Sequence, residues 1–162
     1  MKILVCSDSH GNRENLRCAI ERERPAVVFH LGDGRADILQ VMRDWPEIEL
    51  HSVAGNCDWR SRQRTEELVT LEGCRFLLSH GHEHAVKSGY ESYFSYGLRR
   101  RVDVLLAGHT HVPCVKWQRG ILLMNPGSIG MGTRPSYGIL EPSGGEIVTC
   151  RIQRLEPAVS PR

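Results

Sequence analysis

The sequence lacks a long apolar run: no stretch approaches the ~20 apolar residues that a helix needs to cross a bilayer. After Met1 it passes directly into a strand-like segment, without the basic and then apolar pattern of a secretory signal peptide. Its six cysteines include no Cys-x-x-Cys pair and follow no spacing typical of a disulfide framework. We therefore expect no membrane partner and a reducing, cytoplasmic setting.

The sequence also has little excess charge. Its 21 Lys and Arg against 19 Asp and Glu leave a formal net charge of +2, which is too small to indicate nucleic acid as a partner. Arginines cluster at residues 60–64 and 99–101, and we expect both clusters to be solvent-exposed. The length of 162 residues is typical of one domain, expected over residues 1–155, and residues 156–162, with two prolines, predict a loose tail.

The first half alternates between strand and helix patterns. Short apolar runs predict buried strands at residues 2–6, 27–31 and 48–54. Asn12 caps a predicted helix that extends to about Glu23, and residues 36–45 predict a second helix that Pro46 ends. This alternation requires crossovers between parallel strands and therefore indicates an α/β fold.

The second half is rich in predicted hairpins. Short apolar runs flank turn residues within 68–79, 114–124 and 137–152. Residues 83–100 place apolar side chains on one stripe and predict a helix, and a strand is expected at 102–107. Joined to the first half, these elements predict two packed sheets with helices outside.

Four aromatic side chains lie close together in the predicted helix, namely Tyr90, Tyr93, Phe94 and Tyr96. One helix face cannot bury all of them. We therefore expect some to form a protein interface, for example in a homo-oligomer.

Five of the apolar runs end in a metal-type ligand beside a glycine. In an open α/β sheet, functional groups gather beyond the carboxyl ends of the strands, so these five ends are expected to converge. The seven predicted ligands are Asp8, His10, Asp33, Asn56, His80, His109 and His111. Seven oxygen and nitrogen donors exceed the needs of one cation and suit two ions that share a bridging ligand.

The spacing of these residues supports the same interpretation. Asp8 and His10 are two residues apart, as are His109 and His111, so in an extended segment each pair leaves on one face. Asp33 is the best placed carboxylate for a bridge, and Asn56 supplies a neutral amide oxygen. Mixed oxygen and imidazole donors suit Mn, Fe, Ni or Zn. The sequence offers no set of thiolates of the kind that forms a closed structural zinc site.

The other histidines have weaker patterns. His30 lies within an apolar strand and is interpreted as a core histidine, whereas His51 and His84 are expected to be solvated. His82 lies two residues after His80, and three roles stay open for it: replacing His80 as a ligand, facing a substrate, or no direct part in the site.

Two cations about 3.5–4 Å apart can hold one hydroxide between them, because each lowers the pKa of the shared water. The same ions neutralise the charge that grows on a phosphate ester. The reaction that this arrangement best explains is phosphoester hydrolysis by in-line attack of hydroxide, without a covalent enzyme intermediate. Asp33, Asn56 and His80 are the predicted catalytic residues among the ligands.

The motifs together resemble the calcineurin-like metallophosphoesterase superfamily. They are Asp8-Ser9-His10, Gly32-Asp33, Gly55-Asn56-Cys57-Asp58, His80-Gly81-His82 and Gly108-His109-Thr110-His111. The short length and the segment Asn125-Pro126-Gly127-Ser128 are most similar to the small bacterial and archaeal phosphodiesterases of the superfamily, which are in turn similar to a eukaryotic retromer subunit.

This resemblance implies a four-layer α/β/β/α sandwich of two mixed sheets, with two divalent metal ions at the carboxyl edge and Mn as the working metal. The implied ligands of one ion are Asp8, His10, Asp33 and His111. Those of the other are Asp33, Asn56, His80 and His109.

One position departs from many superfamily members, which have a histidine after the Gly-Asn pair. Here the residue is Cys57, and a thiol is a poor substitute for imidazolium as a proton donor. Cys57, His82 and Arg134 are the predicted substrate-binding residues, with packing alone as the alternative for Cys57. Asp58 is expected to orient a neighbour or cap the following turn, and residues 125–128 to tie loops together.

The leading hypothesis is a metal-dependent phosphodiesterase that acts on a small or nucleotide-like phosphodiester. The alternative is a catalytically weak, metal-binding scaffold that binds a protein partner. A nuclease is less favoured, because the chain offers no clear basic groove. The sequence leaves open the natural substrate, the physiological metal and the oligomeric state.

Overall fold

The computed structural model describes residues 1–60 and 62–156, so the predicted tail, apart from Glu156, lies outside the described residues. One five-stranded sheet has the order β10-β9-β1-β2-β3. Its strands are β1 (Ile3–Cys6), β2 (Val27–His30), β3 (Glu49–Ser52), β9 (Ser136–Ser143) and β10 (Glu146–Arg154). β1, β2 and β3 are parallel, whereas β9 and β10 run antiparallel to their neighbours, so the sheet is mixed.

The second five-stranded sheet has the order β4-β5-β6-β8-β7 and is also mixed. Its strands are β4 (Glu66–Leu71), β5 (Cys74–Ser79), β6 (Val104–Leu106), β7 (Cys114–Gln118) and β8 (Ile121–Asn125). The central strands β5, β6 and β8 are parallel to one another. As in the first sheet, parallel strands bring their carboxyl ends to one edge.

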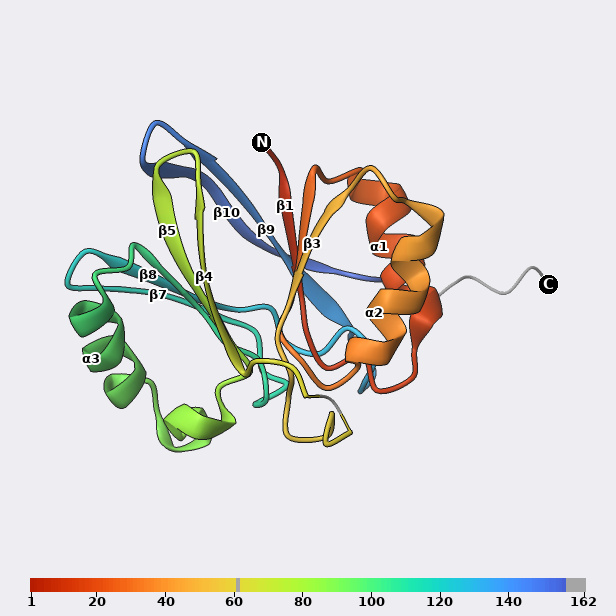
Figure 1. Ribbon diagram of the computed structural model, residues 1–162, viewed down its shortest axis with the longest axis horizontal. Coiled ribbons are helices and arrows are strands. Elements are labelled where there is room, and N and C mark those ends of the chain that lie inside the picture. Colours follow the sequence, from red (N-terminus) through yellow and green to blue (C-terminus); the bar gives the residue numbers. More distant parts are fainter. Residues whose placement is uncertain (61, 157–162) are drawn as a thin grey trace.

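Helices cover the outer faces of both sheets. The helical elements are α1 (Arg13–Glu23), α2 (Arg35–Val41), α3 (Glu91–Arg100) and the 3₁₀ turns η1 (Met42–Asp44), η2 (His82–His84) and η3 (Val86–Ser88). Figure 1 shows α1 and α2 outside the first sheet and α3 outside the second, which confirms the predicted α/β/β/α layers. None of the described helices has the length and apolarity that crossing a membrane requires.

The alternation of side chains along the strands builds three apolar layers. Ile3 and Val5 of β1 face the space between the sheets, where they share a core with Phe76 of β5. Leu4 and Cys6 point the other way and pack under α1 and α2. Because β1 is buried on both faces, it is a continuous apolar run in the sequence.

The N-terminal helices follow their local sequence. Asn12 caps α1 as predicted, because its Oδ1 accepts a hydrogen bond from the backbone N–H of Asn15 at 3.1 Å. The second predicted helix is α2 followed by the 3₁₀ turn η1, which ends before Pro46. The prediction of a helix over these residues is therefore correct in position, although its last turn is tighter.

The predicted helix over residues 83–100 is wrong in its first half. The chain forms the two 3₁₀ turns η2 and η3 there, and α3 begins only at Glu91. Two residues interrupt the helical path, since Ala85 has φ 52° and Gly89 has φ 129°. Glycine is a poor helix former and adopts such a φ at little cost.

The expected exposed aromatic patch is not formed by these residues. Tyr90, Tyr93 and Phe94 are buried, and Tyr96 is half-buried. Because Tyr90 precedes α3, the helix itself has to bury fewer rings than the sequence pattern implied. The hydroxyl of Tyr93 reaches into the sheet and donates to the carbonyl oxygen of Leu106 at 2.8 Å.

The histidines outside the motifs are less exposed than predicted. His51 is half-buried between Glu49 and Glu67, and the ring of His84 stacks on Tyr93 with the ring centroids 4.6 Å apart. The prediction that both are solvated is therefore wrong. The core interpretation of His30 is confirmed: its side chain is buried, and burial lowers its pKa to about 4.

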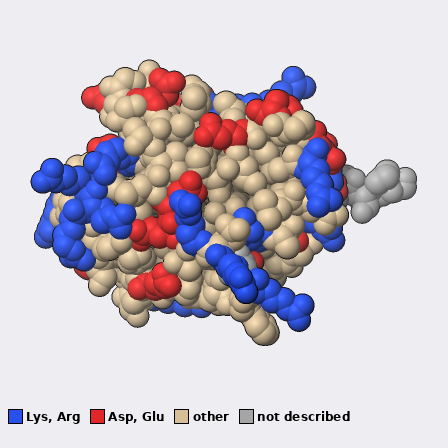
Figure 2. Space-filling model, viewed as in Figure 1, with Lys and Arg blue, Asp and Glu red and all other residues tan. Residues whose placement is uncertain are grey.

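Charged side chains are unevenly spread over the face seen in Figure 2. Basic side chains gather over the α3 end, at the left, and elsewhere on this face they are interspersed with acidic ones. Arg99 and Arg101 are exposed as predicted, but Arg100 bonds to Glu66 of β4 at 2.6 Å. Arg60, Arg62 and Arg64 are exposed.

Candidate metal centre

The seven predicted ligands lie together at the edge where the parallel strands end, at the bottom of Figure 1. Hydrogen bonds between loops hold this edge in place. The backbone N–H of Asp8 donates to Gly32 at 2.9 Å, and that of Gly108 donates to His80 at 2.9 Å. The two sheets are then joined across the centre, because the N–H of His109 donates to Asp8 Oδ2 at 3.1 Å.

Five of these residues have a left-handed backbone. The φ angles are 56° at Asp8, 43° at His10, 53° at Asp33, 68° at His109 and 60° at His111. The assumption that the Asp-x-His and His-x-His pairs converge because their segments are extended is therefore wrong; tight turns after the strands converge them instead. A left-handed residue other than glycine costs roughly 1 kcal/mol, and such strain clusters at functional sites.

One group of ligand atoms comes from Asp8, His10 and His111, all within 4.8 Å of one another. Asp8 Oδ1 lies 3.0 Å from His111 Nε2 and 3.5 Å from His10 Nε2. The other oxygen, Oδ2, accepts hydrogen bonds from Ser7 Oγ at 2.5 Å and from the N–H of His109. Neighbouring donors thus hold Oδ2 in place, while Oδ1 faces the two imidazole rings.

A second group comes from Asp33, His80 and His109. His80 Nε2 lies 3.3 Å from Asp33 Oδ2, 3.2 Å from His109 Nδ1 and 3.0 Å from Asn56 Oδ1. His80 Nδ1 lies 2.8 Å from the carbonyl oxygen of Leu31. Because a carbonyl only accepts, Nδ1 carries a proton, and in the neutral ring Nε2 directs its lone pair toward the carboxylate and amide oxygens.

Asp33 connects the two groups. It belongs to the second group and also to a third, with His10 and Cys57, whose ligand atoms lie within 4.8 Å of one another. Its Oδ1 accepts from the N–H of Cys57 at 2.7 Å, which leaves Oδ2 toward the histidines. Asp33 is therefore the carboxylate placed between the two sets of ligands.

The ionisation of the pair Asp33 and His80 follows from this geometry. Burial alone raises the pKa of Asp33, but the hydrogen bonds from His80, when its ring is protonated, and from Cys57 outweigh it and lower the pKa below its ordinary value. Burial alone lowers the pKa of His80, but the carboxylates of Asp33 and Asp8 outweigh it and raise the pKa. The two carboxylates thus create a site that favours positive charge.

Asp58 holds two of the loops together. Its carboxylate accepts backbone hydrogen bonds from Asp33 and Gly55, both at 2.8 Å, and from Gly34 and Arg35 at 3.1 and 3.2 Å. Asp58 therefore orients its neighbour Asp33, as the sequence suggested. Charge-assisted bonds of this kind are stronger than neutral ones.

Two further supports were predicted at residues 125–128. Asn125 Nδ2 donates to the carbonyl oxygen of Gly108 at 2.8 Å, and Ser128 Oγ donates to the carbonyl oxygen of Asp8 at 2.8 Å. These bonds join the β8–β9 connection to two ligand-bearing loops, so the prediction that the segment ties loops together is confirmed.

Sequence reasoning missed Ser7, Ser9 and Asp37. Ser7 holds one oxygen of Asp8, whereas Ser9 Oγ donates to Asp37 Oδ2 at 2.8 Å. Asp37 also accepts from the backbone N–H of Gly11 at 2.9 Å, which connects α2 to the β1 loop. The two serines flank Asp8 in the sequence, and that adjacency is the signal that could have identified them; nothing in the sequence pairs Asp37 with this loop.

The predicted substrate-binding residues have different places. Cys57 is exposed beside Asp33, and partial desolvation together with that carboxylate raises the pKa of its thiol. The ring of His82 lies 5.4 Å from that of His80, outside the groups of ligand atoms, and its buried Nδ1 lacks a hydrogen-bond partner among the described residues. The side chain of Arg134 is exposed and contributes no ion pair among the described residues.

The comparisons with known proteins agree on one family. Residues 1–145 match the family model described as "Calcineurin-like phosphoesterase superfamily domain". The chain is 33% identical over 146 residues to "Probable metallophosphoesterase YsnB" of Bacillus subtilis, covering 86% of this chain and 83% of that one. It is 30% identical over 162 residues to "Phosphodiesterase MJ0936" of Methanocaldococcus jannaschii, covering 87% and 93%.

Solved structures share the architecture. Wild-type Vps29 from Entamoeba histolytica, complexed with Zn²⁺, has a TM-score of 0.73 and 23% identity, covering 96% of this chain and 98% of that one. At this identity the likeness shows a common fold.

Proposed function

Since the chain belongs to the calcineurin-like phosphoesterase superfamily, we propose that it is a metal-dependent phosphodiesterase whose active site is the candidate metal centre. It hydrolyses a small or nucleotide-like phosphodiester through a hydroxide that bridges two divalent metal ions. The observation that carries this proposal is the position of Asp33, whose carboxylate belongs to ligand groups on both sides of the centre.

The residues fit a pair of cations. Each carboxylate has one oxygen held by protein donors and the other turned toward imidazole nitrogens. Nδ1 of His80 donates its hydrogen to the carbonyl oxygen of Leu31, so Nε2 of the neutral ring is an acceptor. Nε2 also faces oxygen acceptors, and such an arrangement is favourable only when a cation or a proton lies between them. The proposed ligands of one ion are Asp8, His10, Asp33 and His111, and those of the other are Asp33, Asn56, His80 and His109.

The donor set also bears on the metal. Two carboxylates, one amide and four imidazoles suit Mn, which we propose as the working metal, and also Fe, Ni or Zn. When bound, two such ions lower the pKa of a shared water and neutralise charge on the phosphate oxygens.

The chain itself positions these groups. Leu31 fixes the tautomer and direction of His80, and Asp58 and Cys57 fix Asp33 through backbone bonds. Such outer partners hold ligands in place, and their loss costs about 10–100-fold in metal affinity or activity. Cys57, His82 and Arg134 are the proposed contacts to the substrate. Burial and the neighbouring carboxylates raise the pKa of the Cys57 thiol, and a thiol donates at most a weak hydrogen bond.

The test is turnover of bis(p-nitrophenyl) phosphate by protein that is stripped of metal and then given Mn²⁺. We expect hydrolysis by the wild type and a loss of kcat/KM on the order of 10²-fold or more in Asp33→Asn, because a ligand should matter at least as much as its supports. Asp44→Asn is the matched control, since Asp44 lies at an exposed ion pair with Arg17 on α1. Its turnover should equal that of the wild type.

Two results contradict the proposal. Equal activity in Asp33→Asn and Asp44→Asn would show that Asp33 takes no part in hydrolysis. Absence of turnover with Mn²⁺, Fe²⁺, Ni²⁺ and Zn²⁺, despite an intact fold by circular dichroism, would favour the metal-binding scaffold instead.

A further inference from the structure

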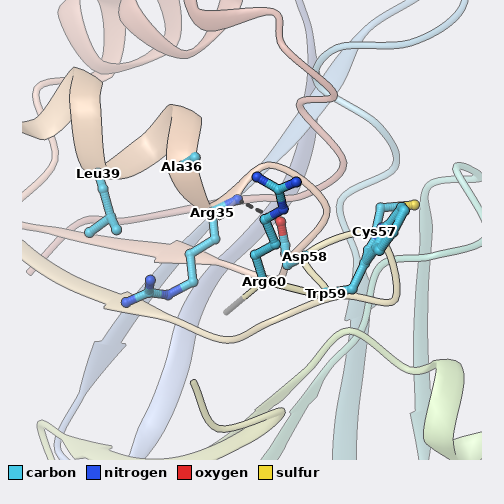
Figure 3. A pocket seen from close by; sticks show the side chains of 7 residues that line it. All are labelled: Arg35, Ala36, Leu39, Cys57, Asp58, Trp59 and Arg60. Carbon is cyan, nitrogen blue, oxygen red and sulfur yellow. Dashed lines mark hydrogen bonds between the residues drawn. The ribbon is translucent and has the colours of Figure 1, made fainter. Parts of the chain in front are cut away.

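A cavity of about 600 Å³ opens beside the metal centre. Figure 3 shows Ala36 and Leu39 of α2 on one side and Cys57 and Trp59, from the loop after β3, on the other. The side chain of Arg35 extends along the α2 side, below Leu39 in this view, and Arg60 lies between the two walls. The cavity thus combines apolar surface with two guanidinium groups.

We propose that this cavity binds a planar aromatic ester group of the substrate, a ring of the nucleobase type, stacked on Trp59. The inference rests on the proposed function, because it takes the metal centre as the position of the phosphorus. It specifies the substrate as a phosphodiester in which at least one ester group is a nucleoside or a similar aromatic group.

The position of Cys57 connects the two sites. Its sulfur lies within 4.8 Å of ligand atoms of His10 and Asp33, and the same residue lines the cavity. A phosphodiester whose phosphorus lies at the metal centre must place its two ester groups on either side of it. The cavity is next to that point and is large enough for one nucleoside-sized group.

The walls suit a flat ring. Trp59 is 86% exposed and Leu39 is 42% exposed, although both are large apolar residues. An indole offers a rigid face for stacking, and such stacking is tolerant of the identity of the base. The loop after β3 therefore presents an aromatic surface that no other described side chain covers.

The charges of the cavity favour an anionic ligand. Among residues 1–60 and 62–156, neither Arg35 nor Arg60 forms an ion pair, and Arg35 Nε is buried without a hydrogen-bond partner. Asp58 also lines the cavity, but its two oxygens are already occupied by four backbone N–H groups. The guanidinium groups thus remain available to a phosphate or to the face of a base.

The surroundings of the site indicate a small diester rather than a long strand. The cavity has room for one nucleoside, and the basic side chains on the face seen in Figure 2, apart from those at the α3 end, are interspersed with acidic ones instead of forming a continuous groove. A strand would require a basic path for several phosphates.

Binding of adenosine 5′-monophosphate and of ribose 5-phosphate to the manganese-loaded protein tests the inference, because ribose 5-phosphate has a hydroxyl group in place of the base. Isothermal titration calorimetry should give a dissociation constant about tenfold or more lower for adenosine 5′-monophosphate, which is the range of one base–aromatic stack. Trp59→Ala should remove this difference while leaving the dissociation constant of ribose 5-phosphate unchanged. Trp59→Phe should retain most of it.

Trp117→Ala is the matched control, because Trp117 is 62% exposed on β7 and does not line this cavity. Equal affinity of the wild type for the two ligands, or an unchanged preference in Trp59→Ala, would overturn the inference. Sedimentation equilibrium gives a further test. If the wild type is a dimer and Trp59→Ala is a monomer, the cavity binds a second copy of the chain, and the inference is overturned.

These outcomes are distinct from those for the enzyme itself. A protein that hydrolyses bis(p-nitrophenyl) phosphate but shows no preference for the base contradicts only the inference. A protein that binds adenosine 5′-monophosphate through Trp59 but hydrolyses no diester contradicts only the proposed function.

Discussion

Asp58 accepts a hydrogen bond from the backbone of Asp33, and the two loops that carry these residues are joined by hydrogen bonds in both directions. The carboxylate of Asp58 accepts from the N–H of Asp33 at 2.8 Å, and the carboxylate of Asp33 accepts from the N–H of Cys57, the residue before Asp58, at 2.7 Å. Each carboxylate thus binds the backbone of the loop that carries the other. The arrangement fixes the direction of Asp33 at a left-handed residue, where the chain gains no help from a strand or helix.

We expect Asp58→Asn to lower the free energy of unfolding by about 1–3 kcal/mol, because an amide has one oxygen to offer to four backbone donors. Urea denaturation of the metal-free protein measures this. Metal affinity should also fall, by about 10–100-fold, because Asp33 loses its support. Asp44→Asn should stay within about 0.5 kcal/mol of the wild type; equal stability of the two variants would contradict the role of Asp58.

Divalent metal should stabilise the fold. At a free Mn²⁺ concentration of 100 times the dissociation constant, each site adds about 2.7 kcal/mol to the free energy of unfolding. Thermal denaturation with Mn²⁺ and then with excess chelator measures the gain and its reversal. His109→Ala should reduce the gain, whereas Trp117→Ala, on the edge strand β7, should keep it in full; an identical gain in both variants would exclude His109 from the ligands.

Cys57→His should favour substrates with poor leaving groups. An imidazolium near Asp33 can protonate a departing alkoxide, whereas the thiol of Cys57, with its raised pKa, cannot do so effectively. We expect the ratio of kcat/KM for an alkyl diester to that for an aryl diester to rise about tenfold or more, since general acid catalysis contributes about 10²–10⁴-fold. Cys57→Ser is the control; a uniform change for both substrates in Cys57→His would refute the prediction.

His51 should make stability depend on pH. Burial alone lowers its pKa, but the hydrogen bonds and charges of Glu67 and Glu49 outweigh burial and raise it above the ordinary value. Protonated His51 therefore stabilises the fold at pH values below the unfolded pKa, and this contribution is lost as the pH rises through the raised pKa.

His51→Gln should accordingly lower the free energy of unfolding more at pH 5.5 than at pH 8.5. The difference should be less than about 1 kcal/mol, as for other partly exposed ion pairs. Urea denaturation at the two pH values measures it. A larger loss at pH 8.5 would show that the neutral ring, and not its charge, is the stabilising form.

Much of the fold can be predicted from local patterns in the sequence. The apolar run of β1 is buried on both sides, and an Asn cap and a following Pro bound the first helix. The motif residues Asp8 and Asp33 follow the neighbouring parallel strands β1 and β2, so the parallel arrangement of those strands was sufficient to predict that they meet, whereas His109 follows β6 of the other sheet and reaches them through the packing of the two sheets. Chain topology carries this information, because consecutive βαβ units place the carboxyl ends of their parallel strands at one edge of the sheet.

Other features depend on contacts between distant segments. Breaks at Ala85 and Gly89 interrupt a stripe that otherwise predicts a helix from residue 83, and the neighbouring rings are buried by the sheet. The left-handed turns at the ligands, the pairing of Ser9 with Asp37, and the cavity beside Trp59 arise only when loops from both sheets and α2 come together. The sequence by itself therefore determined the layers and the set of ligand-type residues, through periodicity and spacing. Only the tertiary structure decided which oxygen of each carboxylate is free and what surrounds it, because those directions result from hydrogen bonds between residues far apart in the chain.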